Sequence, residues 1–194
     1  MLEKRPNFSE IESRKISEWY KEKIFRFESS KESQPYTIIM PPPNVTGSLH
    51  MGHALTFTLQ DILIRFYKKL GKNVLWQPGT DHAGIATEII VEKKLLKEKK
   101  KSKIQLGRDE FLEQVWKWKN QSGDNITEQL KRLGTSIDWS ISKFTLDEEC
   151  SVSVKKAFID LYNSGYIYQN ERLVNWDPKL QTAVSDLEVT QKEI

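Results

Sequence analysis

The sequence predicts an α/β fold in which helices cover a parallel β-sheet. The main observation is a short β-branched segment at 36–40, a helical pattern at 51–70 and a second short apolar segment at 74–76. Strand, helix and strand of these lengths are typical of a βαβ crossover, whose parallel strands need helices over the sheet. The length of 194 residues suits one compact domain, or one domain with part of another.

Composition narrows the class of protein. Phe, Tyr and Trp make up 10% of the chain, which argues against disorder. The net charge of +3 permits a nucleotide or nucleic-acid partner without requiring one. Cys150 is the single cysteine, so an internal disulfide and a cysteine zinc site are both excluded. Because the chain also lacks a membrane-length apolar run and a secretory signal, we expect a cytoplasmic protein without a membrane partner.

The first 35 residues form a polar extension before the first strand. A helix is predicted over Ser9–Lys23, packed on the domain from outside. Tyr36–Met40 is short and β-branched, and it ends at Pro41–Pro43, so we expect a buried strand there. Three prolines fit neither a helix nor a sheet and predict a rigid extended loop, with a tight turn at Gly47.

The next element is a helix over Met51–Leu70. Its apolar residues recur at helical spacing, namely Leu55, Leu59, Ile62, Leu63, Phe66 and Leu70. Gly71 is a suitable residue to end this helix. A second strand over Val74–Trp76 follows and closes at Pro78–Gly79.

Further helices are predicted towards the C-terminus. We expect them over Gly84–Lys100, over Asp109–Leu133 with an interruption near Gly123, and over Asp147–Asn163. Tyr166–Tyr168 and Leu173–Trp176 flank a short polar connection and predict a β-hairpin. The polar tail after residue 181 has no capping element, which indicates a chain cut before its next domain.

All three histidines lie in two short motifs. His50 and His53, three residues apart at the start of the predicted 51–70 helix, share one side of its first turn. A helix start offers free backbone N–H groups and the positive end of the helix dipole, which together favour a phosphate. Gly52 leaves bare backbone between the rings for a base or sugar. The spacing alone also fits an incidental pair, and zinc would need a third ligand that the sequence does not supply nearby.

These motifs resemble a known family. Residues 41–55, PPPNVTGSLHMGHAL, resemble the HIGH signature region of the class I aminoacyl-tRNA synthetases, in the form found in the valyl-tRNA synthetase family. Residues 79–87, GTDHAGIAT, are similar to a second motif of that family. The resemblance continues through 133–134, 138–139, 144–147 and 172–178, and so covers nearly the whole chain.

The resemblance implies a fold and a reaction. The fold is the first half of a Rossmann-like (HUP-type) nucleotide-binding domain over 36–170, after a helical extension over 1–35 and before a hairpin or stalk over 171–194 that leads into an editing insertion. The reaction activates valine with ATP to valyl-adenylate and transfers it to tRNA(Val). A small apolar pocket rejects isosteric threonine poorly, which accounts for the family's editing domain.

The resemblance also assigns roles to residues. Catalysis falls to His50 and His53, which contact the ATP phosphates as charge builds in the transition state. The ATP-binding set is Asn44, Thr46, Gly47, His50, Gly52 and His53. The valine-binding set is Pro42, Asn44 and Asp81, with the Asp81 carboxylate on the α-ammonium. Mg²⁺ accompanies ATP on phosphate oxygens. Asp177 and Leu180 stand where relatives sometimes carry cysteines, so we expect no protein-bound zinc.

Several features have a plainer alternative. Asp81 fits a helix N-cap ahead of Ala83–Gly84, and His82 could either touch substrate or orient the loop. The Lys93–Lys103 run could attract tRNA phosphates, although a solvated helix face is the preferred interpretation. Trp116 and Trp118 lie two apart on a helix, so we expect one in the core and one partly exposed.

Three hypotheses about activity remain open. The chain contains no KMSKS motif, so as an N-terminal segment of a valine–tRNA ligase it is expected to be inactive by itself. A related nucleotidyltransferase and a non-catalytic nucleotide-binding fragment are the alternatives. A monomer is expected.

Overall fold

The computed structural model describes residues 6–28, 34–99 and 101–192, and its chain divides into two compact units, Met1–Ser151 and Val152–Ile194. Within the described residues, no helix is both long and apolar enough to cross a membrane.

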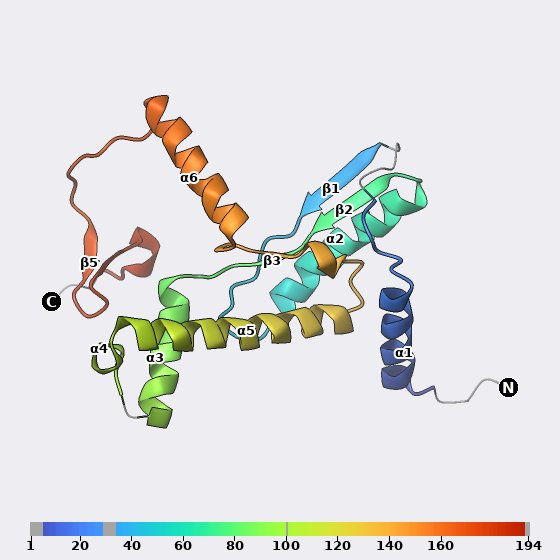
Figure 1. Ribbon diagram of the computed structural model, residues 1–194, viewed down its shortest axis with the longest axis horizontal. Helices are drawn as coiled ribbons and strands as arrows, with labels where there is room; N and C mark the ends of the chain where they lie inside the picture. The colour runs from blue at the N-terminus through green and yellow to red at the C-terminus, as the bar shows by residue number, and fades with distance from the viewer. Residues whose placement is uncertain (1–5, 29–33, 100, 193–194) are drawn as a thin grey trace. The chain divides into compact units, whose positions relative to one another are not determined.

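The first unit is built on a β–α–β crossover, as predicted. Strand β1 (Pro35–Ile39) pairs in parallel with β2 (Asn73–Gln77), with Tyr36 opposite Val74 and Ile38 opposite Trp76, and α2 (Met51–Lys69) connects them (Figure 1). A buried cluster lies between these strands, α2 and the second half of α5, formed by Met40, Phe57, Ile64, Trp76, Ile126, Leu130 and Ile137.

Three helices form a second cluster in this unit. They are α3 (Ile85–Lys99), α4 (Lys103–Leu106) and α5 (Arg108–Arg132), of which α4 was not predicted. Val91 and Leu95 on α3 pack against Phe111 on α5, where the two helices cross (Figure 1). The predicted interruption at Gly123 is wrong, because α5 continues through it without a break. Lys100, within the lysine run, lies outside the described residues.

A short parallel pair extends the arrangement. β3 (Gly79–Thr80) runs beside β4 (Lys143–Phe144), which follows a 3₁₀ turn, η1 (Trp139–Ile141). The 2-residue strands are too short to show a periodic pattern, so no sequence pattern predicts them. Their pairing brings the segment after β2 next to residues 143–145.

Strand β1 is less buried than expected. Met40, just after it, is buried, but Ile39 has 74% of its surface exposed, and exposed and half-buried residues alternate along the strand. β1 pairs with β2 alone in a 2-stranded sheet, so one edge of β1 has no partner strand among the described residues. The exposed residues that alternate along β1 show that one of its faces is uncovered there.

Helix α2 buries a different face from the one that its apolar residues suggest. The helix itself is confirmed, and its buried residues are Phe57 and Ile64. The apolar residues that recur at helical spacing are all exposed: Leu55, Leu59, Ile62, Leu63, Phe66 and Leu70. The buried face also carries the half-buried His53, Gln60 and Tyr67, so polar atoms lie on the side that packs.

Helix α1 (Phe8–Lys21) packs from outside, as predicted. Its N-cap is Asn7, and none of its residues is buried. The Tyr20 hydroxyl accepts a bond from Trp139 Nε1 at 2.9 Å and lies 3.4 Å from the Thr135 carbonyl oxygen. Tyr20 is half-buried, and its partial burial raises the pKa of the hydroxyl, although the hydrogen bond from Trp139 lowers it.

The second unit contains a hairpin at a different position from the predicted one. Helix α6 (Glu148–Asn163) reaches into this unit from the first, and the antiparallel strands are β5 (Asn175–Asp177) and β6 (Thr182–Val184), followed by the 3₁₀ turn η2 (Asp186–Glu188). The turn forms at Asp177–Pro178, because the Asp177 carboxylate accepts the N–H groups of Lys179 and Leu180 at 2.8 and 3.0 Å. The predicted hairpin around 169–172 is therefore wrong.

Candidate active site

The start of α2 is closed by its own two histidines. His50 is the N-cap, with an extended backbone, and its Nδ1 accepts the N–H of Gly52 at 3.1 Å. His53 Nδ1 in turn accepts the N–H of His50 at 3.2 Å, which completes a capping box. The two rings are tilted by 38° with centroids 3.9 Å apart.

This geometry fixes where each ring carries its hydrogen. An Nδ1 atom that accepts an N–H bond is unprotonated, so a neutral imidazole in that position has its hydrogen on Nε2. His50 and His53 both have this arrangement. Each ring therefore keeps one N–H donor, Nε2–H, for a ligand.

The helix amides are less available than the sequence suggests. The Gly52 N–H points at the His50 ring instead of a ligand, because it caps the helix. Gly52 also meets a steric need: a Cβ there would lie 2.9 Å from Cε1 of His50. The two imidazole Nε2–H groups add donors to this helix start, where the positive end of the helix dipole also lies.

The site favours the neutral form of the His53 ring. Burial lowers the pKa of His53, and the neighbouring His50 lowers it further. Residues 51–54 are Met, Gly, His and Ala, so no acidic side chain in the first turn opposes an anion. Neutral Nε2–H donors can bind phosphate oxygens without losing the cap.

A cavity of about 540 Å³ lies against this helix start. Its lining includes most of the predicted site, namely Pro42, Asn44, Thr46, His50, Gly52 and His53. Gly47 and Asp81 are not among its lining residues. The volume is within the range of small-molecule sites, roughly 300–1,000 Å³.

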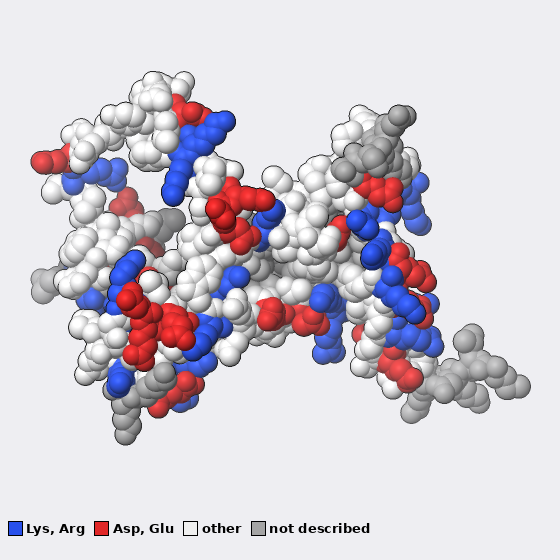
Figure 2. All heavy atoms as spheres, in the orientation of Figure 1, with Lys and Arg blue, Asp and Glu red and all other residues white. Residues whose placement is uncertain are grey.

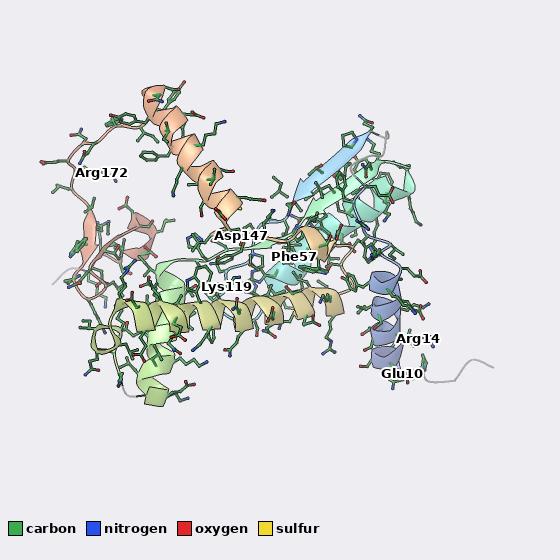
Figure 3. All side chains as sticks on the ribbon, viewed as in Figure 1. Glu10, Arg14, Phe57, Lys119, Asp147 and Arg172 are labelled. Atoms are coloured by element: carbon green, nitrogen blue, oxygen red, sulfur yellow. The ribbon has the colours of Figure 1, made fainter. Side chains whose placement is uncertain are left out.

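The cavity also contains residues that sequence reasoning missed. Thr56 lies one turn beyond His53, and the buried Phe57 stacks on the His53 ring with centroids 6.0 Å apart. Helical spacing could have identified both, because residues three and four positions after His53 share its face. Figure 3 labels Phe57 on α2.

One face of α5 holds the loop that precedes α2. Four side chains at helical spacing make the contacts. Trp118 Nε1 donates to Val45 O at 2.8 Å, and Ser122 Oγ donates to Gly47 O at 3.4 Å. Asn125 Nδ2 donates to Ser48 Oγ at 3.3 Å, and Gln129 Oε1 accepts from Leu49 N at 2.8 Å. The loop has few backbone partners of its own, so α5 supplies them. Trp118 is half-buried and Trp116 is exposed, so the prediction that one of them lies in the core is wrong.

The predicted valine residues meet at a backbone junction. Asn44 and Asp81 form a parallel bridge, in which Val45 N donates to Asp81 O at 3.0 Å and Asp81 N to Pro43 O at 2.9 Å. The end of the proline loop and the segment after β3 are thereby joined. The residues at this junction come from positions about forty apart in the chain, which no local pattern could connect.

Asp81 does not cap a helix. Its Oδ1 accepts the N–H of Ala83 at 3.2 Å, which closes an Asx turn, whereas α3 begins only at Ile85. Ala83 and Gly84 both have left-handed backbones, with φ of 54° and 49°. Such a conformation at a non-glycine residue is costly and is often found at functional sites. The N-cap alternative for Asp81 is therefore wrong.

On the face drawn in Figure 2, basic and acidic side chains are interspersed. Among the described residues, no three His, Cys, Asp or Glu side chains come together as a metal site.

Comparison with known proteins gives a consistent result. Residues 14–194 match the sequence model of a family described as tRNA synthetases class I (I, L, M and V). Curated relatives include the valine–tRNA ligases of Nitrobacter winogradskyi, 55% identical over 196 residues, and Granulibacter bethesdensis, 53% identical over 194 residues. These alignments cover 100% of this chain but 21% and 22% of the relatives, so the chain spans about a fifth of their length.

A solved structure shares the fold. The LeuRS of Agrobacterium radiobacter K84, in a ternary complex with tRNA and LeuAMS, superposes with a TM-score of 0.75 at 23% identity. The match covers 96% of this chain and 22% of that chain. The predicted α/β fold, the first half of a Rossmann-like domain, is confirmed.

Proposed function

Because this chain belongs to the class I tRNA synthetases, we propose that its cavity binds ATP and that the Asn44–Asp81 junction beside it binds valine. The reaction is that of the valine–tRNA ligases to which the chain is similar. Valine and ATP form valyl-adenylate and pyrophosphate, and the valyl group is then transferred to tRNA(Val) with release of AMP.

The observation that carries this proposal is the pair of Nε2–H donors on His50 and His53. Both rings line a cavity of nucleotide size, and both have Nδ1 occupied by the helix cap. As the valine carboxylate attacks the α-phosphorus, negative charge builds on the phosphate oxygens. Donors that are already oriented stabilise this charge without reorganisation. Asn44 and Thr46 line the same cavity and bind the nucleotide beside them.

The amino acid is held by charge and by shape. The Asp81 carboxylate binds the α-ammonium through a charge-assisted bond, and the rigid ring of Pro42 forms a wall beside the side chain. Asn44, which bridges to Asp81, lies between the two halves of the site. Mg²⁺ is carried by the phosphate oxygens and water.

We propose further that this 194-residue chain alone supports little adenylation. Its sequence contains no KMSKS motif, the lysine-rich loop that the family resemblance assigns to the departing pyrophosphate. Binding of ATP and valine is then the property to measure first, before catalysis.

An NMR titration of the ¹⁵N-labelled chain tests the proposal. MgATP should shift the amides of residues 44–57, and L-valine should shift those of 81–83. His53→Ala should weaken ATP binding by about 10-fold or more, the value of one hydrogen bond to a charged group. Leu59→Ala, at an exposed position of α2 outside the cavity, is the control and should bind ATP normally.

Chemical-shift changes confined to other regions, or unchanged ATP affinity in His53→Ala, would contradict the assignment. Pyrophosphate exchange that depends on valine and is as fast as in a complete enzyme would contradict the expected low activity.

A further inference from the structure

Thr145 lies just after β4 and contacts the Asp81 loop, although 64 positions separate it from Asp81. Its hydroxyl donates to Asp81 Oδ1 at 3.1 Å. The Thr145 hydroxyl oxygen also accepts the backbone N–H of His82 at 3.0 Å and lies 2.6 Å from His82 Nδ1. One hydroxyl therefore joins three groups of two neighbouring residues.

A count of hydrogens orients this cluster. The Thr145 hydroxyl has one hydrogen, and a carboxylate attracts it more strongly than a neutral imidazole nitrogen does. Because the Thr145 hydroxyl directs its hydrogen at Asp81, the contact with His82 requires His82 Nδ1–H to be the donor. His82 thus has the opposite tautomer from His50 and His53, and both of its donors point at Thr145.

This arrangement leaves the Asp81 carboxylate with one oxygen free. Oδ1 accepts from Thr145 and from the N–H of Ala83 at 3.2 Å, and it lies 3.2 Å from His82 Nδ1. Oδ2 accepts no hydrogen bond from any residue that the structure describes. With 34% of its side chain exposed, Asp81 can present Oδ2 to a ligand while Oδ1 holds it in place.

The position of Thr145 is itself well determined. Its N–H donates to Thr80 O at 3.2 Å, and Lys143 N donates to Pro78 O at 3.2 Å, so β4 continues its pairing up to the threonine. The preceding Phe144 is buried, and its N–H donates to the Asp147 carboxylate at 2.8 Å. Figure 3 labels Asp147 beside the start of α6.

We propose that Thr145 is a positioning residue for recognition of the substrate ammonium, with His82 as its partner. This inference rests on the proposed function, in which Asp81 binds the α-ammonium of valine. By occupying Oδ1, the hydroxyl keeps the carboxylate from rotating and directs Oδ2 at the ligand. Thr145 acts through Asp81 and does not touch the substrate.

The test compares Thr145→Val, which removes the hydroxyl at nearly constant shape, with Thr145→Ser, which retains it. We expect Thr145→Val to weaken valine binding to the full chain about 10-fold and Thr145→Ser to restore it. Binding of 3-methylbutanoate, which is valine without its ammonium, should be equal in all three proteins. Thr135→Val is the matched control, because it removes a buried hydroxyl bonded to Leu130 O, far from Asp81 in the chain. It should not affect valine binding.

Two results would overturn the proposal. One is equal loss of valine and 3-methylbutanoate binding in Thr145→Val, which would indicate a general structural role. The other is full additivity of Thr145→Val with Asp81→Asn, because the effects of residues that act as one unit are not additive.

The ¹³C signal of the Asp81 carboxyl separates this inference from the proposed function. It should shift in Thr145→Val and not in Thr145→Ser, whether or not valine binds. A wild-type chain that binds no valine contradicts the proposed function, and positioning of Asp81 by Thr145 is then decided by that signal alone.

Discussion

The backbone N–H of His50 donates to Nδ1 of His53 across an N···N distance of 3.2 Å. A helix cap usually relies on a hydroxyl or carboxylate, and Gln or Glu commonly occupies the third helical position. Here two imidazoles take both roles, and each keeps its Nε2–H for another partner. The same side chains therefore begin the helix and define the site.

This arrangement predicts a pH effect on folding. Burial and the nearby His50 lower the pKa of His53 below its value of 6.5 in the unfolded chain. The unfolded state thus binds a proton more readily, and the contribution of His53 is complete above pH 6.5 and is lost as pH falls through the lowered pKa. We expect the free energy of unfolding in urea to decrease from pH 7 to pH 5.5. In His53→Gln, which keeps an acceptor but does not titrate, the decrease should be smaller. An equal decrease in both proteins would contradict a neutral cap.

The contacts between α5 and the loop predict the effect of Gln129→Leu. This change removes the side-chain oxygen that accepts the Leu49 N–H. Of the contacts between α5 and the loop, this hydrogen bond is the nearest to His50 in the sequence. An unpaired, partly buried N–H costs about 1–3 kcal/mol. Urea unfolding measures the loss of stability, and NMR should show altered amide shifts for 45–50. The control is Glu128→Gln, whose exposed ion pair with Lys131 is worth less than about 1 kcal/mol. A loss in Gln129→Leu no greater than in this control would mean that the loop is held by other contacts.

The sequence predicted where helices and strands lie better than it predicted which face of a helix is buried. The lengths of β1, α2 and β2 follow from β-branched runs, helical spacing and turn residues, all of which are local. Which side of α2 is buried depends on what packs against it. Phe57 and Ile64 are buried because the second half of α5 lies on their side, whereas Leu59 and Phe66 are exposed. Apolar periodicity identifies a helix but not its partner.

The site was predictable only in part, for a similar reason. His50, Gly52 and His53 adjoin in the sequence, so helix geometry brings them together. The contact between Asp81 and Thr145 arises from the pairing of β3 with β4, two strands too short to leave a pattern. The aromatic content at 166–176 predicts a hairpin there, whereas the turn residues at Asp177–Pro178 determine where the hairpin forms. Those turn residues have a direct mechanism, since the Asp177 side chain accepts the turn's N–H groups.

The two faces of α2 predict opposite outcomes for two substitutions. Phe57 is 1% exposed within the core cluster, so Phe57→Ala should destabilise the chain by about 3–5 kcal/mol. Leu59, two positions away, is 56% exposed, and Leu59→Ala should cost less than about 1 kcal/mol. Urea denaturation of the two variants measures both values. Similar losses would show that the exposed face of α2 is packed in solution.

The final prediction concerns two glycines that have different surroundings. A Cβ at Gly79 would lie 2.8 Å from the Lys143 carbonyl oxygen, inside the β3–β4 pair that joins the Asp81 loop to Thr145. The backbone cannot yield easily, so Gly79→Ala should destabilise the chain by about 1–3 kcal/mol. It should also weaken valine binding, because the pair that aligns Asp81 with Thr145 is forced apart.

Gly123 provides the matched control. It lies inside α5, and no described atom beyond the helix's own backbone and its chain neighbours comes within 4 Å of an added Cβ. Ala is favoured over Gly in a helix interior by about 0.5–1 kcal/mol, so Gly123→Ala should stabilise the chain. Urea unfolding and valine titration of both variants separate a general cost of replacing glycine from a local clash. Stabilisation by Gly79→Ala would mean that β3 and β4 approach less closely in solution, and that Thr145 does not depend on this pairing for its position.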